Sequence, residues 1–316
     1  MYNYAVIGRN FIVDWFLEAA AEIPEISLTG VYSRSKAAAE EYALKNGARK
    51  TYTSIEEICR DNEIDFVYIA SPNICHKPQA INLLSGGKHV LCEKPAAISY
   101  NEFKEIIAAS GNSVFMEGMV PLHMPGYKKI CELLPLLGEI RNIDFNFCQY
   151  SSRYDRYKNG IMTNTFDKSL GNGALMDLGI YCVEMLIALF GMPTEICGSA
   201  IFSGIDTVDS IVCKYPEKIA KINVSKISDS VLPSQIQGEN GCLLIDKLSR
   251  PKVITLCPKG GEKQVYDTSE NKHDMSYEIK SFVSMMNGEK NPYFNNITSQ
   301  AMKFCDEARK KLGIIF

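Results

Sequence analysis

The sequence predicts an α/β protein in two parts, a doubly wound parallel sheet followed by an α+β region. Over the first 120 residues, short apolar runs alternate with helical patterns, and the first run, Tyr4–Gly8, reads as a strand turning into a helix. After Pro121, strand-like runs follow one another with few helices between them. A chain of 316 residues also exceeds the roughly 250 to 300 residues at which a single core stops growing. We therefore expect two domains, over 1–120 and 121–316.

The elements of the first part follow from local patterns. Ser35 is placed to cap a helix that ends near Gly47, and Ser54 and Ser99 each open a capping box with a glutamate three residues later. Buried parallel strands read as continuous apolar runs, as in Phe66–Ala70. Expected strands cover 2–7, 27–32, 66–70, 89–93 and 113–117, and expected helices cover 12–23, 36–46, 55–62, 78–84 and 100–110.

In the second part of the chain, helical patterns and strand-like runs no longer alternate. A polar loop over 149–172 precedes a long helix over 174–190, which Gly191 and Pro193 end. Successive strands without crossover helices predict an antiparallel or mixed sheet. Expected strands cover 140–148, 196–202, 208–215, 219–227, 234–238, 242–246 and 253–256, and further helices cover 126–134, 277–286 and 299–312.

Composition narrows the class of protein. The chain has 34 basic and 37 acidic residues, a balance that argues against a nucleic-acid or membrane-surface partner. Hydrophobic content of 46% is ordinary for a soluble protein, and we expect no membrane span, because no run approaches the roughly 18 apolar residues that one needs. Eleven scattered cysteines without a Cys-x-x-Cys, and four histidines without a paired spacing, predict reduced thiols and no metal site. We expect a cytoplasmic, metal-free protein.

Gly8 ends the first strand where a dinucleotide pyrophosphate would meet a helix N-terminus. The fingerprint G-x-G-x-x-G requires glycine at positions 10 and 13 as well, and this chain has Asn10 and Val13. Asn10 can adopt the left-handed conformation that keeps the turn, although its side chain would crowd the phosphates. We expect Gly8, Asn10, Phe11 and Ile12 to contact the cofactor, and the alternative is a plain strand-to-helix connection.

The end of the second strand bears on cofactor choice. NAD enzymes place an acid there for the ribose hydroxyls, whereas NADP enzymes use a hydroxyl and an arginine for the 2′-phosphate. Ser33 and Arg34 stand at this point, and no acid occurs before Glu40. The pair favours NADP, with NAD possible if Arg34 is merely solvated or stacks on the adenine.

Two further segments follow buried strands at the same edge. Ser71, Pro72 and Asn73 come after the strand 66–70, where Asn73 can bond the ribose or carboxamide near the nicotinamide. His76 follows, either beside the cofactor or, as we favour, simply orienting the loop.

Glu93-Lys94-Pro95 follows the strand 89–93. A partly desolvated Lys94 beside a cationic nicotinamide would have its pKa lowered, and it could exchange a proton or polarise a carbonyl. The alternative is a surface lysine paired with Glu93.

Asp177 and Tyr181 lie at i and i+4 and would share one helix face. A tyrosine near a lysine can exchange a proton at the reacting oxygen, while Asp177 would bond a substrate hydroxyl or orient the Lys94 ammonium. The alternative is an acid favoured by the helix dipole beside a core tyrosine. The glycines at 171, 173 and 179 indicate a close approach by another backbone or a ligand.

Taken together, these motifs resemble the glucose–fructose oxidoreductase/inositol dehydrogenase/MocA family of NAD(P)-dependent oxidoreductases. Its dihydrodiol dehydrogenase and NADP-dependent D-xylose dehydrogenase branch looks most similar. The resemblance runs the length of the chain and includes Gly8, Ser33-Arg34, Ser71-Pro72-Asn73 with His76, Glu93-Lys94-Pro95, Met116-Glu117, 166–181, 238–241 and 306–313.

The resemblance implies that Lys94 and Tyr181 form the proton-transfer pair, with Asp177 beside them in the substrate pocket. It also implies an N-terminal Rossmann domain, a large, mostly antiparallel open C-terminal sheet, and homodimers or higher oligomers paired through those sheets. The chain departs from the family pattern in its glycine-poor loop, in Asn172 and in the segment Pro121–Pro125. The loop bears on cofactor affinity and binding geometry, and the segment 121–125 indicates a different substrate, so substrate identity is not inherited.

The sequence therefore predicts an oxidoreductase that moves a hydride between NADP and a hydroxyl or carbonyl carbon of a small polyhydroxylated molecule, a sugar or cyclitol. One alternative is a non-catalytic sensor of cofactor or sugar with the same fold. The other is a reductase of a non-sugar carbonyl that uses the same site residues.

Overall fold

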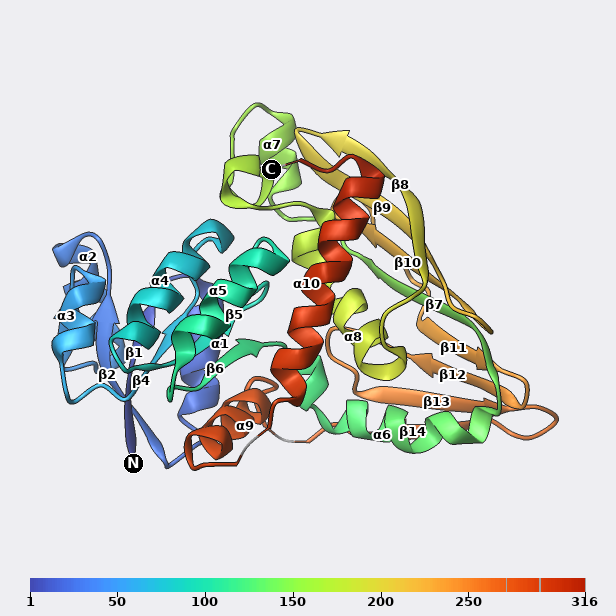
Figure 1. Cartoon of the computed structure of the whole chain (residues 1–316), viewed down its shortest axis with the longest axis horizontal. Helices are drawn as coiled ribbons and strands as arrows, with labels where there is room; N and C mark the ends of the chain where they lie inside the picture. Colours follow the sequence, from blue (N-terminus) through green and yellow to red (C-terminus); the bar gives the residue numbers. More distant parts are fainter. Residues whose placement is uncertain (271, 290, 316) are drawn as a thin grey trace. The chain divides into compact units, whose positions relative to one another are not determined.

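The computed structural model describes residues 1–270, 272–289 and 291–315 (Figure 1). Contacts between these residues form two compact units, 1–119 with 272–299 and 120–270 with 300–315. The sequence pattern gives no sign that 272–299 belongs to the first unit. The functional division into a dinucleotide-binding domain over 1–120 and a substrate-binding and dimerisation domain over 121–316 stays a prediction.

The first unit is built on a parallel sheet of six strands in the order β3-β2-β1-β4-β5-β6 (Figure 1). This is the strand order of the dinucleotide-binding Rossmann fold, so the predicted fold class is confirmed. The unit comprises β1 (Tyr2–Ile7), α1 (Phe11–Ala20), β2 (Ile26–Tyr32), α2 (Lys36–Asn46), β3 (Lys50–Tyr52), α3 (Ile55–Arg60), β4 (Phe66–Ile69), α4 (Asn73–Ser85), β5 (His89–Glu93), α5 (Tyr100–Ser110), β6 (Phe115–Gly118), α9 (Ser276–Met286) and the start of α10 (Tyr293–Leu312).

The helix starts in this unit follow the predicted side chains. The hydroxyls of Ser35, Ser54 and Ser99 each accept a hydrogen bond from a backbone N–H three residues on, and Gly47 ends α2 in the left-handed conformation. The prediction for α4 was wrong by five residues. We expected this helix over 78–84, whereas α4 begins directly after Pro72 and contains Pro78.

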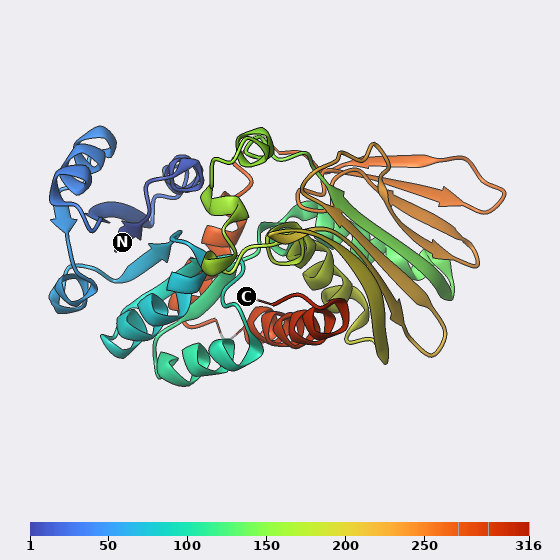
Figure 2. The same cartoon turned by 90° about the horizontal axis from the view of Figure 1, so that it is seen from above.

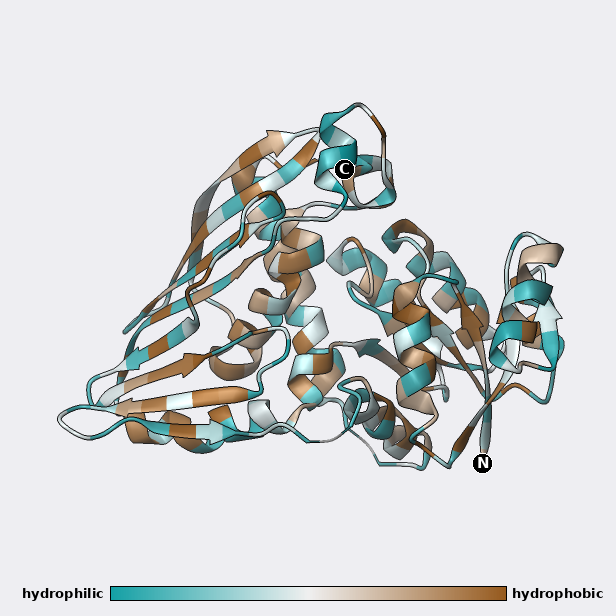
Figure 3. Cartoon of the chain, turned by 180° about the vertical axis from the view of Figure 1, so that it is seen from behind, coloured by the Kyte–Doolittle hydropathy of each residue, from teal (hydrophilic) through white to brown (hydrophobic). Residues whose placement is uncertain are grey.

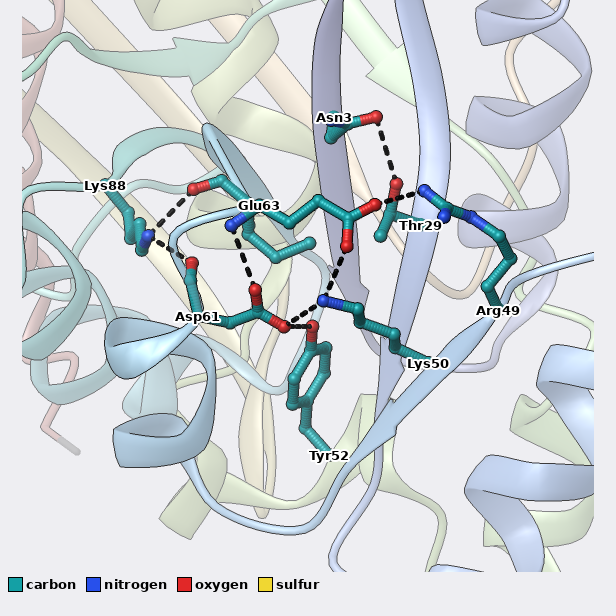
Figure 4. A network of polar contacts seen from close by, with 9 residues as sticks. Asn3, Thr29, Arg49, Lys50, Tyr52, Asp61, Glu63 and Lys88 are labelled. Atoms are coloured by element: carbon teal, nitrogen blue, oxygen red, sulfur yellow. Dashed lines mark hydrogen bonds and ion pairs between the residues drawn. The ribbon is translucent and has the colours of Figure 1, made fainter.

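A network of hydrogen bonds and ion pairs links segments at the amino ends of the strands of this sheet (Figure 4). The Lys50 ammonium donates to Asp61 at 2.6 Å, the Tyr52 hydroxyl donates to the same oxygen at 2.8 Å, and Lys88 donates to the Asp61 and Ile64 carbonyls. Burial opposes ionisation of Asp61, but the hydrogen bond from Lys50 and those from its other neighbours outweigh it and lower its pKa to about 2. Because cofactors bind at the carboxyl ends of such strands, this network is structural.

The second unit contains an eight-stranded sheet in the order β14-β13-β12-β11-β7-β10-β9-β8 (Figure 2). Only β7 and β10 pair in parallel, so the predicted mixed, mostly antiparallel sheet is confirmed. The unit comprises η1 (Val120–His123), α6 (Pro125–Leu133), η2 (Leu134–Leu137), β7 (Ile140–Cys148), α7 (Tyr154–Lys158), η3 (Asn164–Phe166), η4 (Lys168–Leu170), η5 (Leu175–Gly179), α8 (Ile180–Phe190), β8 (Glu195–Ser203), β9 (Ile205–Lys214), β10 (Ile219–Ser225), β11 (Ser234–Gly238), β12 (Gly241–Ile245), β13 (Val253–Pro258), β14 (Gln264–Asp267) and the end of α10.

The two faces of this sheet differ in chemistry. Hydrophilic and hydrophobic residues alternate along its strands (Figure 3), as expected for a sheet with one face in the core. Ile143, Phe145 and Ile222 are fully buried on the face against which α8 lies. The strand register aligns one outer-face residue from each strand into a row across the sheet, namely Cys197, Val212, Lys221, Asp144, Gln235, Leu244, Thr255 and Val265.

The helix predicted over 174–190 is not a single α-helix. Its first turn, η5, is a π-helix, and α8 follows from Ile180. The helical stretch Lys168–Phe190 also meets the length and composition criteria for a membrane span, contrary to our expectation that no run does. Most of it is buried inside the unit, which is the setting of a core helix in a soluble protein.

Candidate functional site

Gly8 lies between β1 and α1 in a backbone conformation that only glycine adopts readily, with φ +121°. A Cβ added there would stand 2.7 Å from the Ala70 carbonyl oxygen, so the loop lies tightly against the end of β4. A strand, a glycine and a helix N-terminus in this order form the usual cradle for a pyrophosphate.

Asn10 does not take the left-handed conformation that the sequence suggested. Its φ is −94°, and it caps α1, its side-chain oxygen accepting from the N–H groups of Ile12 at 3.0 Å and Val13 at 3.3 Å. Its amide donates to the Ala70 carbonyl at 3.2 Å. The side chain therefore braces the loop, and it satisfies two of the amides that would otherwise face a phosphate. Phe11, the first residue of α1, is half exposed.

Ser33 and Arg34 follow β2 directly. The Ser33 hydroxyl accepts a hydrogen bond from the Ser35 N–H at 3.3 Å, which shapes the turn into α2. Arg34 is exposed, and among the described residues its guanidinium forms no hydrogen bond or ion pair. An unengaged guanidinium at this position suits a 2′-phosphate.

His76 holds two loops together. Its ring is buried, with Nδ1 2.8 Å from the Pro95 carbonyl oxygen and Nε2 2.8 Å from that of Ser71. Burial lowers the pKa of His76, because it disfavours the charged ring. The geometry supports the loop-orienting role that we favoured and places Ser71-Pro72-Asn73 beside the Lys94 turn.

Glu117 fixes that turn from the other side. Its buried carboxylate accepts from the Ala96 N–H at 2.6 Å and from the Thr298 hydroxyl at 2.8 Å. Lys94 itself is partly buried at the end of β5, and the preceding Glu93 accepts from the Tyr68 hydroxyl at 2.6 Å. Side chains from β6 and α4 therefore hold the segment that follows Lys94, and Thr298 of α10 holds Glu117 in turn. A functional side chain is kept in place by supporting contacts of this kind.

In the second unit, Asp177 and Tyr181 stand on either side of the junction between η5 and α8. Such π-helical turns frequently mark functional sites. The Tyr181 ring lies 5.6 Å from that of Phe147 on β7. One Asp177 oxygen accepts from the ammonium of Lys226 at 2.8 Å, a partner that the sequence did not indicate.

A pair of buried carboxyl groups holds the start of η5. Asp206 of β9 accepts from the Leu175 N–H at 2.8 Å, and a Cβ added to Gly173 would stand 2.0 Å from its other oxygen. Burial first, and then the neighbouring Asp206, raises the pKa of Asp209 to about 9, so Asp209 carries a proton that it can donate to Asp206. The glycine at 173 therefore makes room for a side chain and not, as predicted, for a backbone or a ligand.

Sequence reasoning missed Glu117, Lys226 and Asp206 as parts of the site. The family resemblance included Glu117 but gave it no role, whereas Lys226 and Asp206 stand in or beside strands with nothing local to mark them. Among the described residues, no group of three or more His, Cys, Asp or Glu side chains is placed to hold a metal ion.

Comparison with known proteins gives the family. Residues 2–114 match the model of an oxidoreductase family with an NAD-binding Rossmann fold, and residues 136–244 match the GFO/IDH/MocA C-terminal domain. The chain is 38% identical over 325 residues to scyllo-inositol 2-dehydrogenase (NADP(+)) IolU of Bacillus subtilis, covering 100% of this chain and 98% of the relative. The chain belongs to the GFO/IDH/MocA oxidoreductase family. The family prediction is thereby confirmed.

A further relative and a solved structure extend the comparison. Trans-1,2-dihydrobenzene-1,2-diol dehydrogenase of Xenopus laevis is 28% identical, covering 99% of each chain, which accords with the predicted branch. The 3-ketoreductase KijD10 of Actinomadura kijaniata, solved in complex with NADP and TDP-benzene, superposes with a TM-score of 0.87 at 18% identity, covering 98% of each chain. At that identity the likeness establishes the fold.

Proposed function

We propose that this protein is an NADP-preferring oxidoreductase that transfers a hydride between the nicotinamide ring and a hydroxyl or carbonyl carbon of a small polyol, a sugar or cyclitol. The observation that carries the proposal is the Lys94 turn, held by Glu117 and His76 at the sheet edge where Gly8 forms the phosphate cradle. The full-length similarity to a scyllo-inositol dehydrogenase supports the substrate class.

The residues of the first unit fit the cofactor. Gly8 admits the pyrophosphate against the backbone because it has no Cβ, and Arg34 supplies a charge for a 2′-phosphate. NADP, when bound, supplies the hydride acceptor or donor. Asn10 has already satisfied two helix amides, so more of the affinity must come from Arg34 and from Ser71-Pro72-Asn73.

The side chains of the protein transfer the proton of the substrate hydroxyl. In this proposal Lys94 and Tyr181 exchange it at the reacting oxygen as general acid and base. Asp177 accepts a hydrogen bond from a neighbouring hydroxyl and fixes the ring of the substrate. A sensor has no use for such a set of acid–base groups, which argues against the non-catalytic alternative.

The first experiment is a titration of the purified protein with NADPH and with NADH, followed by thermal unfolding. A ligand at about 100 times its dissociation constant adds roughly 2.7 kcal/mol to the free energy of unfolding. We expect a clear rise in Tm with NADPH and a much smaller one with NADH, and we expect Arg34→Ala to erase the difference. The absence of a shift with either cofactor would remove the oxidoreductase proposal.

A second experiment identifies the substrate. NADP reduction is followed with inositols, aldoses and trans-dihydrodiols, and NADPH oxidation is followed with simple ketones. The dihydrodiols and the ketones are the non-sugar substrates of the panel. Turnover of a cyclitol or sugar supports the proposal, whereas turnover confined to the non-sugar arm replaces the substrate class and keeps the site. We further propose that the protein works in the cytoplasm as a homodimer or higher homo-oligomer paired through the outer face of the eight-stranded sheet.

A further inference from the structure

Lys226 is a lysine in an unusual place. It follows β10 directly, and its side chain is only 1% exposed. An ammonium taken out of water is costly unless a carboxylate and further acceptors replace the lost hydration. The contacts of the Lys226 ammonium therefore indicate the role of the residue.

Those contacts join two separate segments. The ammonium donates to Asp177 Oδ2 at 2.8 Å and to the Thr165 carbonyl oxygen at 3.0 Å, and it lies 5.3 Å from the centre of the Phe166 ring. Asp177 belongs to η5, while Thr165 and Phe166 belong to η3, a 3-10 turn within the loop that precedes η5. One buried cation thus ties the proposed substrate-binding carboxylate to the loop.

Aromatic stacking extends the tie. The Phe166 ring stacks on that of Tyr157 with centroids 4.8 Å apart and planes inclined by 17°, and the Tyr157 hydroxyl donates to the Ser203 carbonyl at 2.7 Å. The loop side of Lys226 is therefore anchored to β8. Because these contacts fix the Lys226 ammonium, they also fix the orientation of the Asp177 carboxylate that accepts its hydrogen bond.

We propose that Lys226 is a positioning residue of this enzyme, which keeps Asp177 ionised and oriented as the hydrogen-bond acceptor for a substrate hydroxyl. The inference rests on the proposed function. Lys226 donates to Asp177 Oδ2, and an ionised carboxylate offers about four lone-pair sites, so Asp177 can accept from Lys226 and from a substrate hydroxyl together. Its effect is confined to the polyol and does not extend to NADPH.

The test compares Lys226→Met, Lys226→Gln, Asp177→Asn and the double variant Lys226→Gln/Asp177→Asn in the full-length protein. The matched control is Lys158→Met. Lys158 likewise pairs with an aspartate, Asp155 at 2.7 Å, and lies 5.1 Å from the Tyr154 ring, but it is exposed. Steady-state kinetics with the polyol that the parent oxidises are measured across pH, and NADPH binding is measured by the thermal shift.

We expect kcat/KM for the polyol to fall by roughly 10- to 100-fold in Lys226→Met. The NADPH affinity of this variant should stay within about twofold of the parent. In the control Lys158→Met, kcat/KM for the polyol should also stay within about twofold of the parent. Because the carboxylate form of Asp177 loses the cation that favours it, the acid limb of the pH profile moves to higher pH in Lys226→Gln. The double variant is expected to be no more than about threefold worse than Asp177→Asn, since both changes remove the same function.

Three results would overturn the inference. They are a folded Lys226→Gln with the kcat/KM of the parent, an unmoved acid limb, and losses that multiply in the double variant. If the parent binds NADPH and oxidises a polyol, and Lys226→Gln does both equally well, then only this inference fails and the proposed function stands. A parent that oxidises no polyol defeats the proposed function and this inference with it.

Discussion

At the scale of single residues, Lys94 is distinguished by how firmly the structure holds its neighbours. Glu117 binds the Ala96 N–H and His76 lies against the Pro95 carbonyl, so the two residues after the lysine are fixed by side chains distant in sequence. General acid–base groups placed in this way contribute about 10²- to 10⁴-fold to a rate. Glu93-Lys94-Pro95 was visible in the sequence, but the groups that hold it were not.

We expect Lys94→Met to lower kcat by roughly 100-fold or more, because the substitution removes the proposed proton-transfer partner of Tyr181 while keeping the volume of the side chain. The Tm should change little, since Lys94 is only partly buried. Steady-state kinetics and thermal unfolding of the parent and the variant provide the measurement. Turnover within a few-fold of the parent would exclude Lys94 from the mechanism.

Asp209 supplies a prediction for pH dependence. Burial and the Asp206 carboxyl raise its pKa from 3.8 to about 9, so between these values the folded protein holds a proton that the unfolded chain releases. The stability that this proton contributes is complete below about pH 4 and is lost as pH rises through 9. The slope for one such group is at most about 1.4 kcal/mol per pH unit.

In Asp209→Asn that dependence should disappear, because the amide donates to Asp206 at every pH. Urea unfolding at pH 5, 7 and 9 should show the parent losing free energy of unfolding more steeply than the variant. Parallel pH profiles for the two proteins would show that Asp209 is not the group that holds the proton.

At the scale of elements, the start of the helical segment that carries Asp177 and Tyr181 is set by a strand. Asp206 of β9 binds the Leu175 N–H, and its second oxygen occupies the space that a side chain at Gly173 would need. The π-helical turn follows at once. The sequence predicted a helix here and recognised its glycines, but a partner 31 residues away leaves no local signal.

We expect Gly173→Ala to lower the free energy of unfolding by about 1–3 kcal/mol, because the new methyl group displaces the Asp206 carboxylate from the Leu175 N–H. It should also reduce kcat/KM by shifting Asp177 and Tyr181. The cost should be smaller when measured in an Asp206→Ala background, where the space is open. Equal costs in the two backgrounds, measured by urea unfolding, would mean that Asp206 is not the obstacle.

The elements also show how far sequence reasoning extends. Helix starts with a serine cap and strands with a continuous apolar run were predicted within a few residues, since both signals are local. Asn10 was placed in the wrong backbone conformation because asparagine serves both as a helix cap and as a left-handed residue. The Lys226–Asp177 pair was missed because nothing nearby marks a lysine for burial.

At the scale of the whole molecule, the outer face of the eight-stranded sheet decides the oligomeric state that we propose. Its central row carries the ion pair between Lys221 and Asp144 at 2.8 Å, while Val212 and Cys197 continue the row towards the edge strand β8. We place the proposed contact on this row because apolar side chains lie on both sides of the ion pair, Val212 next to Lys221 and Leu244 beyond Gln235. Because the sequence alternates along these strands, the face was predictable, whereas the row across it required the register.

If two copies pair through this face, the parent should elute with about twice the mass of its 35.3 kDa chain. Val212→Arg should shift the protein towards 35.3 kDa, because it places a second cation beside Lys221 at the centre of the contact while a single copy keeps it solvated. Val231→Arg is the matched control, since Val231 is 97% exposed in a loop outside the sheet. Light scattering at several protein concentrations measures the mass, and the Tm of each variant shows whether it is folded. A parent of single-chain mass would exclude the oligomer, and a folded Val212→Arg that retains the parent's higher mass would move the contact to another face.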